Sequence, residues 1–344
     1  MKELILRLSN EINSHLESSS EEIYANNQIK HEKYKITKDK FKQIRLNKSG
    51  IEIAFVDGGI SEIIMAPSIS MHQLRIAIVS YKNLEKKKSV IKDFFLLCKI
   101  VKENDELYYT AKLFPTDNTK PQIYKTKIED SSLKEGFSNG SISKFSSMIL
   151  RFAELNFANE IIKDIEKKSI LILDGSLQQK YNEENTIMKK LVEACVRNET
   201  LLIGFPKTTS VITEDGQDIT FLLRGMKSDK PMWFFGPIIN YKDESYNAKI
   251  FYAKLHKSSK KIFRVEISNE FSHIDYNKIF GEIATISADP IFLGYPYGLI
   301  KVDSLARVTN AEKAQLKTRF MNKVLLEDVE SSLNSHNILD SIKF

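Results

Sequence analysis

Two apolar runs of this chain each end on an aspartate followed by glycine. The first runs from Ile53 to Gly59 and carries Asp57, and the second runs from Ile170 to Ser176 and carries Asp174. Each run indicates a buried strand, and because Asp-Gly is a common turn pair we expect each strand to stop at its aspartate. Carboxylates at one edge of a sheet suit divalent metal ions, which prefer oxygen ligands. The pattern predicts a metal site, and a structural turn is the alternative for either aspartate taken alone.

A third carboxylate, Glu154, interrupts the apolar stripe of a predicted helix. That helix is expected over about residues 143–167, where Phe157 and Ile161 share one face with Glu154. A buried carboxylate without a partner loses much of its solvation free energy. We therefore expect either a metal ion or a basic side chain beside Glu154. Arg151, three residues earlier, is the obvious basic candidate.

The three carboxylates together suit phosphodiester hydrolysis. That reaction needs an activated water and relief of charge on the leaving oxygen, and two metal ions roughly 4 Å apart serve both oxygens. Mg²⁺ and Mn²⁺ both accept oxygen ligands, and Mn²⁺ tolerates mixed ligands better. Asp57, Glu154 and Asp174 therefore predict a two-metal nuclease centre.

The elements expected around these residues give an α/β fold. Apolar runs between Ile51 and Pro115 predict antiparallel strands, with a turn at Asp57-Gly58-Gly59, and a long loop is expected over 116–140. After the helix that carries Glu154 we expect a strand ending at Asp174. A helix over 184–197 and a strand over 201–205 should follow, so this part of the sheet is parallel. This order is that of the ribonuclease H-like fold, a mixed sheet flanked by helices.

The whole chain divides into three predicted regions. Residues 1–48 are expected to form an N-terminal helical arm, 49–310 the nuclease domain, and 311–344 a C-terminal helical extension. Within the domain, further strands are expected over 232–239, 249–256 and 261–267 and a helix over 276–283. A further helix over 311–334 is expected in the C-terminal extension. Apolar residues of the arm have no evident core to fill, so we expect the arm and the C-terminal helix to mediate homodimerisation and partner binding; they are Leu4, Ile5, Leu8 and Ile12.

Charge and cysteine content limit the class of protein. The net charge of +6 is the small difference between 51 basic and 45 acidic residues, but basic residues cluster over 30–48, 86–88 and 254–264, with Tyr34, Phe41 and Phe263 among them. Such stretches suit contact with phosphates and bases, or form a solvated surface. Cys98 and Cys195 offer neither a disulfide framework nor a zinc ribbon. With no signal peptide, no membrane span and no ATP-binding loop in the sequence, we expect a cytoplasmic protein.

Four short motifs resemble the NurA family of DNA-repair nucleases. Val56 to Gly59 matches the family's VDGS-like segment, and Leu173 to Leu177 matches its LDGSL segment. Pro206 to Ser210 is similar to the family's G-x-S-K-T-S segment, where Lys207 could neutralise a phosphate oxygen or remain a surface lysine. Gly294 to Ile300 is similar to the GYPYPL segment.

Three further residues follow from this resemblance. Tyr295 and Tyr297, in the last motif, could stack on a base or hold a phosphate, although a core role for one of them is equally open. Asp303 stands where many relatives place histidine, and we expect it to be a fourth, weaker metal ligand. The resemblance covers about residues 51–316.

The resemblance also implies an activity and partners. It implies a manganese-dependent 5′–3′ exonuclease and single-strand endonuclease, with Mg²⁺ as the other candidate ion, built as a homodimeric ring around a DNA channel. The implied partners are the hexameric ATPase HerA and the double-strand-break repair nuclease complex, in DNA end resection. A non-catalytic DNA clamp for the ATPase is the alternative, and an RNA-directed nuclease of the same fold is a third reading.

Overall fold

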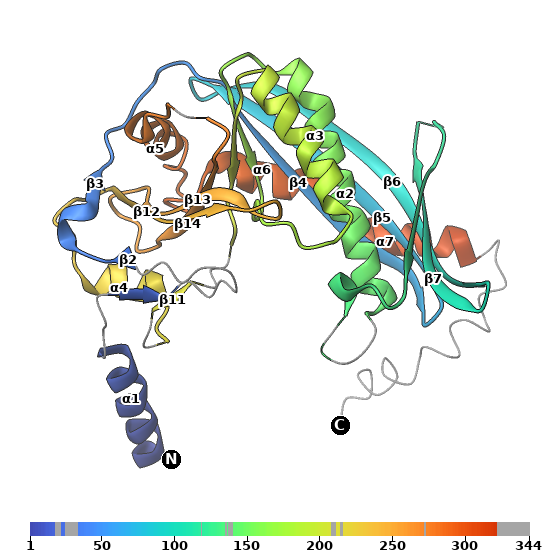
Figure 1. Cartoon of the computed structure of the whole chain (residues 1–344), viewed down its shortest axis with the longest axis horizontal. Helices are drawn as coiled ribbons and strands as arrows, with labels where there is room; N and C mark the ends of the chain where they lie inside the picture. Colours follow the sequence, from blue (N-terminus) through green and yellow to red (C-terminus); the bar gives the residue numbers. More distant parts are fainter. Residues whose placement is uncertain are drawn as a thin grey trace.

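The computed structural model describes residues 1–17, 22–24, 34–117, 119–134, 136, 140–207, 211–213, 216–271 and 273–321. In this part of the chain, a mixed sheet of eleven strands runs through the molecule, with helices on both of its faces (Figure 1). The strands, in the order in which they lie side by side, are β3 (Phe41–Gln43), β12 (Trp233–Lys242), β13 (Asn247–Lys254), β14 (Phe263–Ser268), β10 (Leu201–Gly204), β9 (Ile170–Leu173), β4 (Ile53–Ala66), β5 (Ile69–Lys82), β6 (Glu85–Glu103), β7 (Glu106–Pro115) and β8 (Gln122–Lys127).

Parallel pairing is confined to the middle of the sheet. β9 pairs in parallel with both β4 and β10, and every other neighbouring pair is antiparallel. A separate small sheet is made by β11 (Ile212–Thr213), β1 (Glu22–Tyr24) and β2 (Tyr34–Lys35). The helices are α1 (Lys2–Glu17), α2 (Ile142–Ile161), α3 (Glu184–Arg197), α4 (Ile219–Gly225), α5 (Tyr276–Thr285), α6 (Tyr297–Ala306) and α7 (Asn310–Met321), with short 3₁₀ turns η1 (Lys38–Lys40), η2 (Ser131–Leu133) and η3 (Ile162–Asp164).

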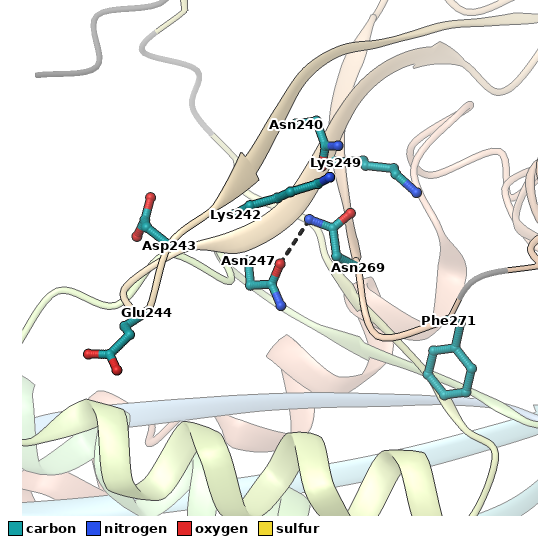
Figure 2. A pocket seen from close by; sticks show the side chains of 8 residues that line it. All are labelled: Asn240, Lys242, Asp243, Glu244, Asn247, Lys249, Asn269 and Phe271. Atoms are coloured by element: carbon teal, nitrogen blue, oxygen red, sulfur yellow. Dashed lines mark hydrogen bonds between the residues drawn. The ribbon is translucent and has the colours of Figure 1, made fainter. Parts of the chain in front are cut away.

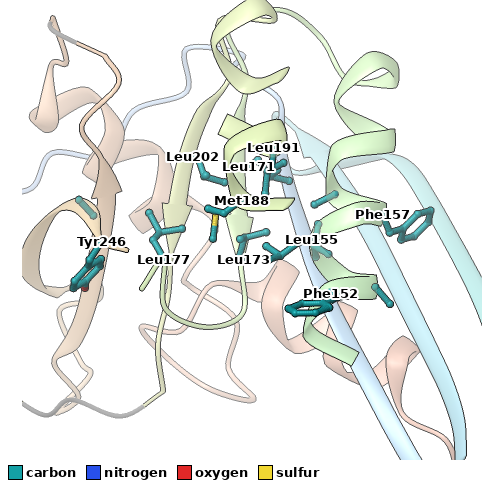
Figure 3. Close-up of a cluster of buried hydrophobic side chains, with 14 of the residues drawn as sticks. Phe152, Leu155, Phe157, Leu171, Leu173, Leu177, Met188, Leu191, Leu202 and Tyr246 are labelled. Carbon is teal, nitrogen blue, oxygen red and sulfur yellow. The ribbon is translucent and has the colours of Figure 1, made fainter. Parts of the chain in front are cut away.

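Two hydrophobic cores cover the two faces of the sheet. Buried residues of α2 and α3 pack against β9 and β10, among them Phe152, Leu155 and Leu191 (Figure 3). On the opposite face α5 and α6 contribute Phe280 and Leu299, and Phe280 stacks on a phenylalanine of β12. Because the central strands are buried on both faces, they are apolar at every position, as parallel strands under helices usually are.

Helix α2 carries one of the predicted site residues and is fixed at its start. Ser141 caps the helix by accepting a hydrogen bond from the Lys144 N–H at 3.2 Å. Much of its length is buried, including Phe145, Phe152 and Ile161. Glu154 lies on the part of this helix that packs against β4, and its side chain is only 15% exposed, whereas Glu160 of the same helix is 56% exposed.

The predicted fold class is confirmed, with corrections at both ends of the domain. The antiparallel strands over 51–115, the helix that carries Glu154, and the order strand, helix, strand over 170–204 are all observed. The expectation that residues 1–48 form a helical arm is wrong for the described residues after Glu17, which contain the strands β1, β2 and β3. β3 joins the large sheet as an edge strand, where Phe41 packs edge-on against Trp233 at 4.7 Å. Burial of this ring, rather than helical spacing, decides the local structure.

Other segments also depart from the prediction. The expected loop over 116–140 contains β8 and η2, because residues 122–127 extend the sheet beside β7. Helices α4 and α6 were not predicted. Only α7 represents the expected helix over 311–334, and the remainder of that segment lies outside the described residues. Arg75 of β5 anchors α7 through an ion pair with Glu312 at 2.8 Å.

Within the described residues, no helix is long and apolar enough to span a membrane.

Candidate metal centre

Three aspartates from three separate elements meet beside the carboxyl end of β9, in the middle of the sheet. Asp57 lies in β4, Asp174 directly follows β9, and Asp303 lies in α6; each offers a carboxylate oxygen, and these oxygens lie within 4.8 Å of one another. The parallel pairing of β4 with β9 sets Val56 opposite Leu173, so the next residue of each strand is an aspartate at the same level. The Asp174 N–H donates to the Val56 carbonyl at 3.0 Å, which fixes this register.

Asp57 does not lie at the end of its strand, so the predicted turn at Asp57-Gly58-Gly59 is wrong. β4 continues to Ala66, and Asp57 pairs with Ala77 of β5. Helix packing explains the glycines: a Cβ on Gly58 would lie 2.5 Å from the Glu154 Oε1 atom, and one on Gly59 would clash with the carbonyl oxygen of Ala306. The glycines therefore let α2 and α6 approach the strand closely, so the feature that suggested a turn serves the centre in another way.

Glu154 lies against this centre from the side of α2. Its carboxylate contacts the backbone at Gly58, and its side chain is 15% exposed. Burial raises the pKa of Glu154 to about 8; Arg151 opposes this shift, and Asp57 and Asp174 reinforce it. Arg151 is 4.0 Å from Glu154, but its close bonds, at 2.9 Å each, go to Glu184 and to the carbonyl of Ser176. The basic partner considered from the sequence is therefore engaged mainly elsewhere.

The aspartates carry more negative charge than their basic neighbours balance. Burial, followed by the charge of Asp174, raises the pKa of Asp57 to about 7. Burial also raises the pKa of Asp174, against the lowering effect of Lys207. Such crowding disfavours ionised carboxylates unless a cation is present. The site is thus electrostatically suited to a multivalent cation.

Two cationic side chains stand at the rim of the centre. The Lys207 Nζ atom lies 2.8 Å from the Asp174 Oδ2 atom and 3.5 Å from the Asp303 Oδ1 atom, and 56% of the lysine side chain is exposed. Burial works against the charge of Lys207, but the surrounding carboxylates outweigh it and raise its pKa. Arg307, one turn after Asp303 in sequence, donates to the Asp303 Oδ2 atom at 2.9 Å. Residues 208–210 of the predicted phosphate segment lie outside the described residues.

Two buried arginine–glutamate pairs hold the loop that follows Asp174. Glu266 of β14 accepts from the Leu177 N–H at 2.7 Å and from the Ser176 hydroxyl at 3.0 Å, and Arg264 pairs with it at 2.9 Å. On the other side Arg151 bridges Glu184 and the same loop. Sequence reasoning missed these pairs. It also placed Arg264 on a basic surface, which is wrong because the side chain is buried beside Glu266.

The two tyrosines of the fourth motif occupy different environments. The Tyr295 ring is buried among Phe205, Phe263 and Phe292, so it offers little free face to a base. Its hydroxyl is buried without a hydrogen-bond partner among the described residues, and burial together with the charge of the three aspartates raises its pKa. Tyr297 opens α6 and packs edge-on against Tyr81 at 5.7 Å.

The basic stretches are spread over several elements. Lys86 to Lys88 lie on β6, and Lys257, Lys260 and Lys261 are exposed between β13 and β14. Lys30 and Lys33 lie outside the described residues. A polar cavity of about 630 Å³ opens at the β12–β13 turn and contains none of the predicted site residues (Figure 2); it is lined by Asn240, Lys242, Asp243, Glu244, Asn247, Lys249, Asn269 and Phe271.

Comparison with known proteins identifies the family. The family model of the NurA domain matches residues 51–308, which is most of the chain. This chain belongs to the NurA family. The match contains β4, α2, β9 and α6, the four elements that position the carboxylates.

A solved structure shares the fold of this chain. The NurA nuclease from Sulfolobus solfataricus aligns with a TM-score of 0.55 and 14% identity over 95% of each chain. Endonuclease V from Bacillus subtilis gives a TM-score of 0.35 and 13% identity over 83% of this chain and 90% of its own. No curated protein matches the sequence.

Proposed function

We propose that this NurA family chain is a metal-dependent deoxyribonuclease that hydrolyses phosphodiester bonds. The observation that carries the proposal is the meeting of Asp57, Asp174 and Asp303, with oxygens within 4.8 Å of one another, beside Glu154. The donor set consists only of carboxylates, which suits the hard cations Mg²⁺ and Mn²⁺. We assign the cation to these four residues, with two ions and Mn²⁺ as the expected composition.

The residues around the carboxylates supply complementary functions. When bound, the divalent ions would activate a water and offset charge on the leaving oxygen. Lys207 is exposed at the rim and reaches the carboxylates, which supports a role for this lysine in binding a phosphate oxygen of the scissile group. The buried Tyr295 hydroxyl, which lacks a partner among the described residues, can donate a hydrogen bond toward the same region.

The finer features of the proposal rest on the family resemblance. They are 5′–3′ exonuclease and single-strand endonuclease activity, action in DNA end resection in the cytoplasm, and work as a homodimer with a HerA-type ATPase and the double-strand-break repair nuclease complex. Helix α1 supports an assembly role, because its leucine and isoleucine side chains within Leu4–Ile12 are at least half exposed, from Leu6 at 62% to Leu8 at 50%.

A nuclease assay on end-labelled DNA tests the proposal. The purified chain should shorten single-stranded and double-stranded substrates in Mn²⁺ or Mg²⁺ and should leave both intact in EDTA. The Asp174→Asn variant is the matched control, because it keeps the basic surfaces and removes one charge. DNA binding without cleavage by the unmodified protein in both metals would contradict the proposal and favour the clamp.

A further inference from the structure

A row of aromatic rings leads from the core beside the metal centre to the surface. Phe205, two residues before Lys207, packs against Tyr295 at 5.4 Å, and Tyr295 stacks on Phe292 at 5.0 Å with the ring planes only 15° apart. Phe263 closes the group, lying 5.4 Å from Tyr295 and 5.9 Å from Phe292. The row therefore joins the neighbourhood of the carboxylates to the outside of the molecule.

The outer end of this row is exposed. Phe205 is fully buried and Tyr295 is 6% exposed, whereas Phe292 is 38% exposed. Tyr295 covers one face of the Phe292 ring, so the exposed area lies on its remaining surface. The preceding residue, Ile291, is 79% exposed. Two adjacent large apolar side chains thus face solvent beside a site that we propose to act on DNA.

The segment that presents these side chains is held in one conformation. Asp289 accepts a hydrogen bond from the Ile291 N–H at 2.9 Å, and the Gly294 N–H donates to the Ser287 carbonyl at 2.8 Å. Gly294 has a φ of +88°, and a Cβ there would lie 2.8 Å from the Ser259 hydroxyl oxygen. The segment therefore packs tightly against the turn between β13 and β14, and little ordering would be needed when it binds a ligand.

The same turn adds positive charge. Lys257, Lys260 and Lys261 are exposed there, and none of them forms an ion pair with another residue in the described ranges. A ring with a free surface beside several unpaired ammonium groups matches the chemistry of a single nucleic-acid strand, whose bases stack and whose phosphates carry charge.

We propose that Phe292 is a stacking platform for one unpaired base of a single DNA strand, with the lysines of the β13–β14 turn holding its backbone. The strand would then pass over Tyr295 and Lys207 to the carboxylates. This inference rests on the proposed function, since it assumes that the carboxylate centre receives DNA. It moves the base-stacking role from the two tyrosines to the exposed ring next to them.

Binding measured without metal separates the platform from catalysis. Fluorescence anisotropy in EDTA would compare a short fluorescein-labelled single strand with the same sequence as a blunt duplex. For Phe292→Leu we expect roughly 5-fold or greater loss of affinity for the single strand and a much smaller change for the duplex, whose bases remain stacked. Phe292→Trp should restore single-strand binding. A strand with 2-aminopurine should show fluorescence quenching with the unmodified protein and less with Phe292→Leu.

Phe114→Leu is the matched control, because Phe114 on β7 is 37% exposed. It should bind both DNAs as the unmodified protein does. Unchanged single-strand affinity in Phe292→Leu, an equal loss for single strand and duplex, or failure of the unmodified protein to bind single strands would each overturn the inference. Failure of cleavage in Mn²⁺ with the predicted binding pattern intact would instead count against the proposed function alone.

Discussion

Two groups of acidic residues lie around the loop that follows β9, and they differ in how their charge is balanced. Glu184 and Glu266 are fully buried and each pairs with an arginine at 2.9 Å. Asp57, Asp174 and Asp303 instead have carboxylate oxygens within 4.8 Å of one another. Their basic neighbours at the rim are Lys207 and the exposed Arg307. The comparison shows that buried acids in this protein fall into two electrostatic classes. Each glutamate has its own arginine, whereas the aspartates share fewer positive charges than they carry negative ones, which suits the metal site proposed above.

The two groups also depend on each other. The paired glutamates hold Ser176 and Leu177, and Asp174 directly precedes this loop. Buried ion pairs contribute little net stability, but breaking one leaves an uncompensated charge and is costly. We therefore interpret the arginine–glutamate pairs as the rigid support of the loop after β9. We interpret the crowded aspartates as the group that binds a cation.

The largest effect on cleavage is expected within the crowded group of aspartates, Asp57, Asp174 and Asp303. Asp57→Asn or Asp174→Asn should lower cleavage of end-labelled DNA by on the order of 10³-fold or more, because each removes a ligand charge from the centre. The metal-free variants should melt at the same temperature as the unmodified protein or higher, since carboxylate repulsion is relieved. The nuclease assay measures the change in cleavage, and calorimetry measures the melting temperature. Near-normal cleavage by either variant would remove that aspartate from the centre.

At the paired glutamates, Glu184 and Glu266, we expect a loss of stability instead. Glu266→Ala should lower the free energy of unfolding by about 3–5 kcal/mol, because Arg264 would remain buried without its partner and two loop donors would lose their acceptor. Urea denaturation measures this change. A loss below about 1 kcal/mol would show that Arg264 finds another partner and that the loop needs no such support.

A third buried group, around His72, is uncharged at neutral pH, and protonation of this histidine at low pH would add a charge without a partner. The His72 Nε2 atom lies 3.0 Å from the hydroxyls of Ser70 and Ser146 in the core, and burial, followed by the charge of Lys313, lowers its pKa to about 4. The unfolded chain, with a pKa near 6.5, binds more protons in this window, so stability should fall as pH drops from 6.5 to 4.

The unmodified protein should lose about 3 kcal/mol more than His72→Gln between pH 7 and pH 4. Urea denaturation at both pH values gives the comparison. Parallel losses in the two proteins would mean that His72 is not held neutral by its surroundings.

The smallest effect is expected at Asp303, whose side chain is 39% exposed, against 4% for Asp174. Asp303→Ala should lower cleavage about 10-fold with either metal. Asp303→His should retain activity in Mn²⁺ and have lower activity in Mg²⁺, because imidazole supplies a nitrogen that Mg²⁺ accepts poorly. Normal cleavage by the alanine variant in both metals would leave Asp303 as a partner of Arg307 only.

The sequence predicts the parts of this centre that depend on local pattern. Strands β4 and β9 follow from continuous apolar runs, and Glu154 follows from its position on an apolar helix face. Gly58 was misread as a turn because local turn propensity cannot reveal that Glu154 packs against it. Glu266 was missed because its contact with the loop joins residues 89 positions apart, and no local signal reports such a pair.

The central claim is that the crowded aspartates, and not the paired glutamates, hold the metal. Isothermal titration of the metal-free protein with MnCl₂ tests it directly, with Asp174→Asn and Glu184→Gln as the matched pair of variants. We predict that Mn²⁺ binding is lost or strongly weakened in Asp174→Asn and retained in Glu184→Gln. Equal Mn²⁺ binding by the unmodified protein and Asp174→Asn would contradict the account.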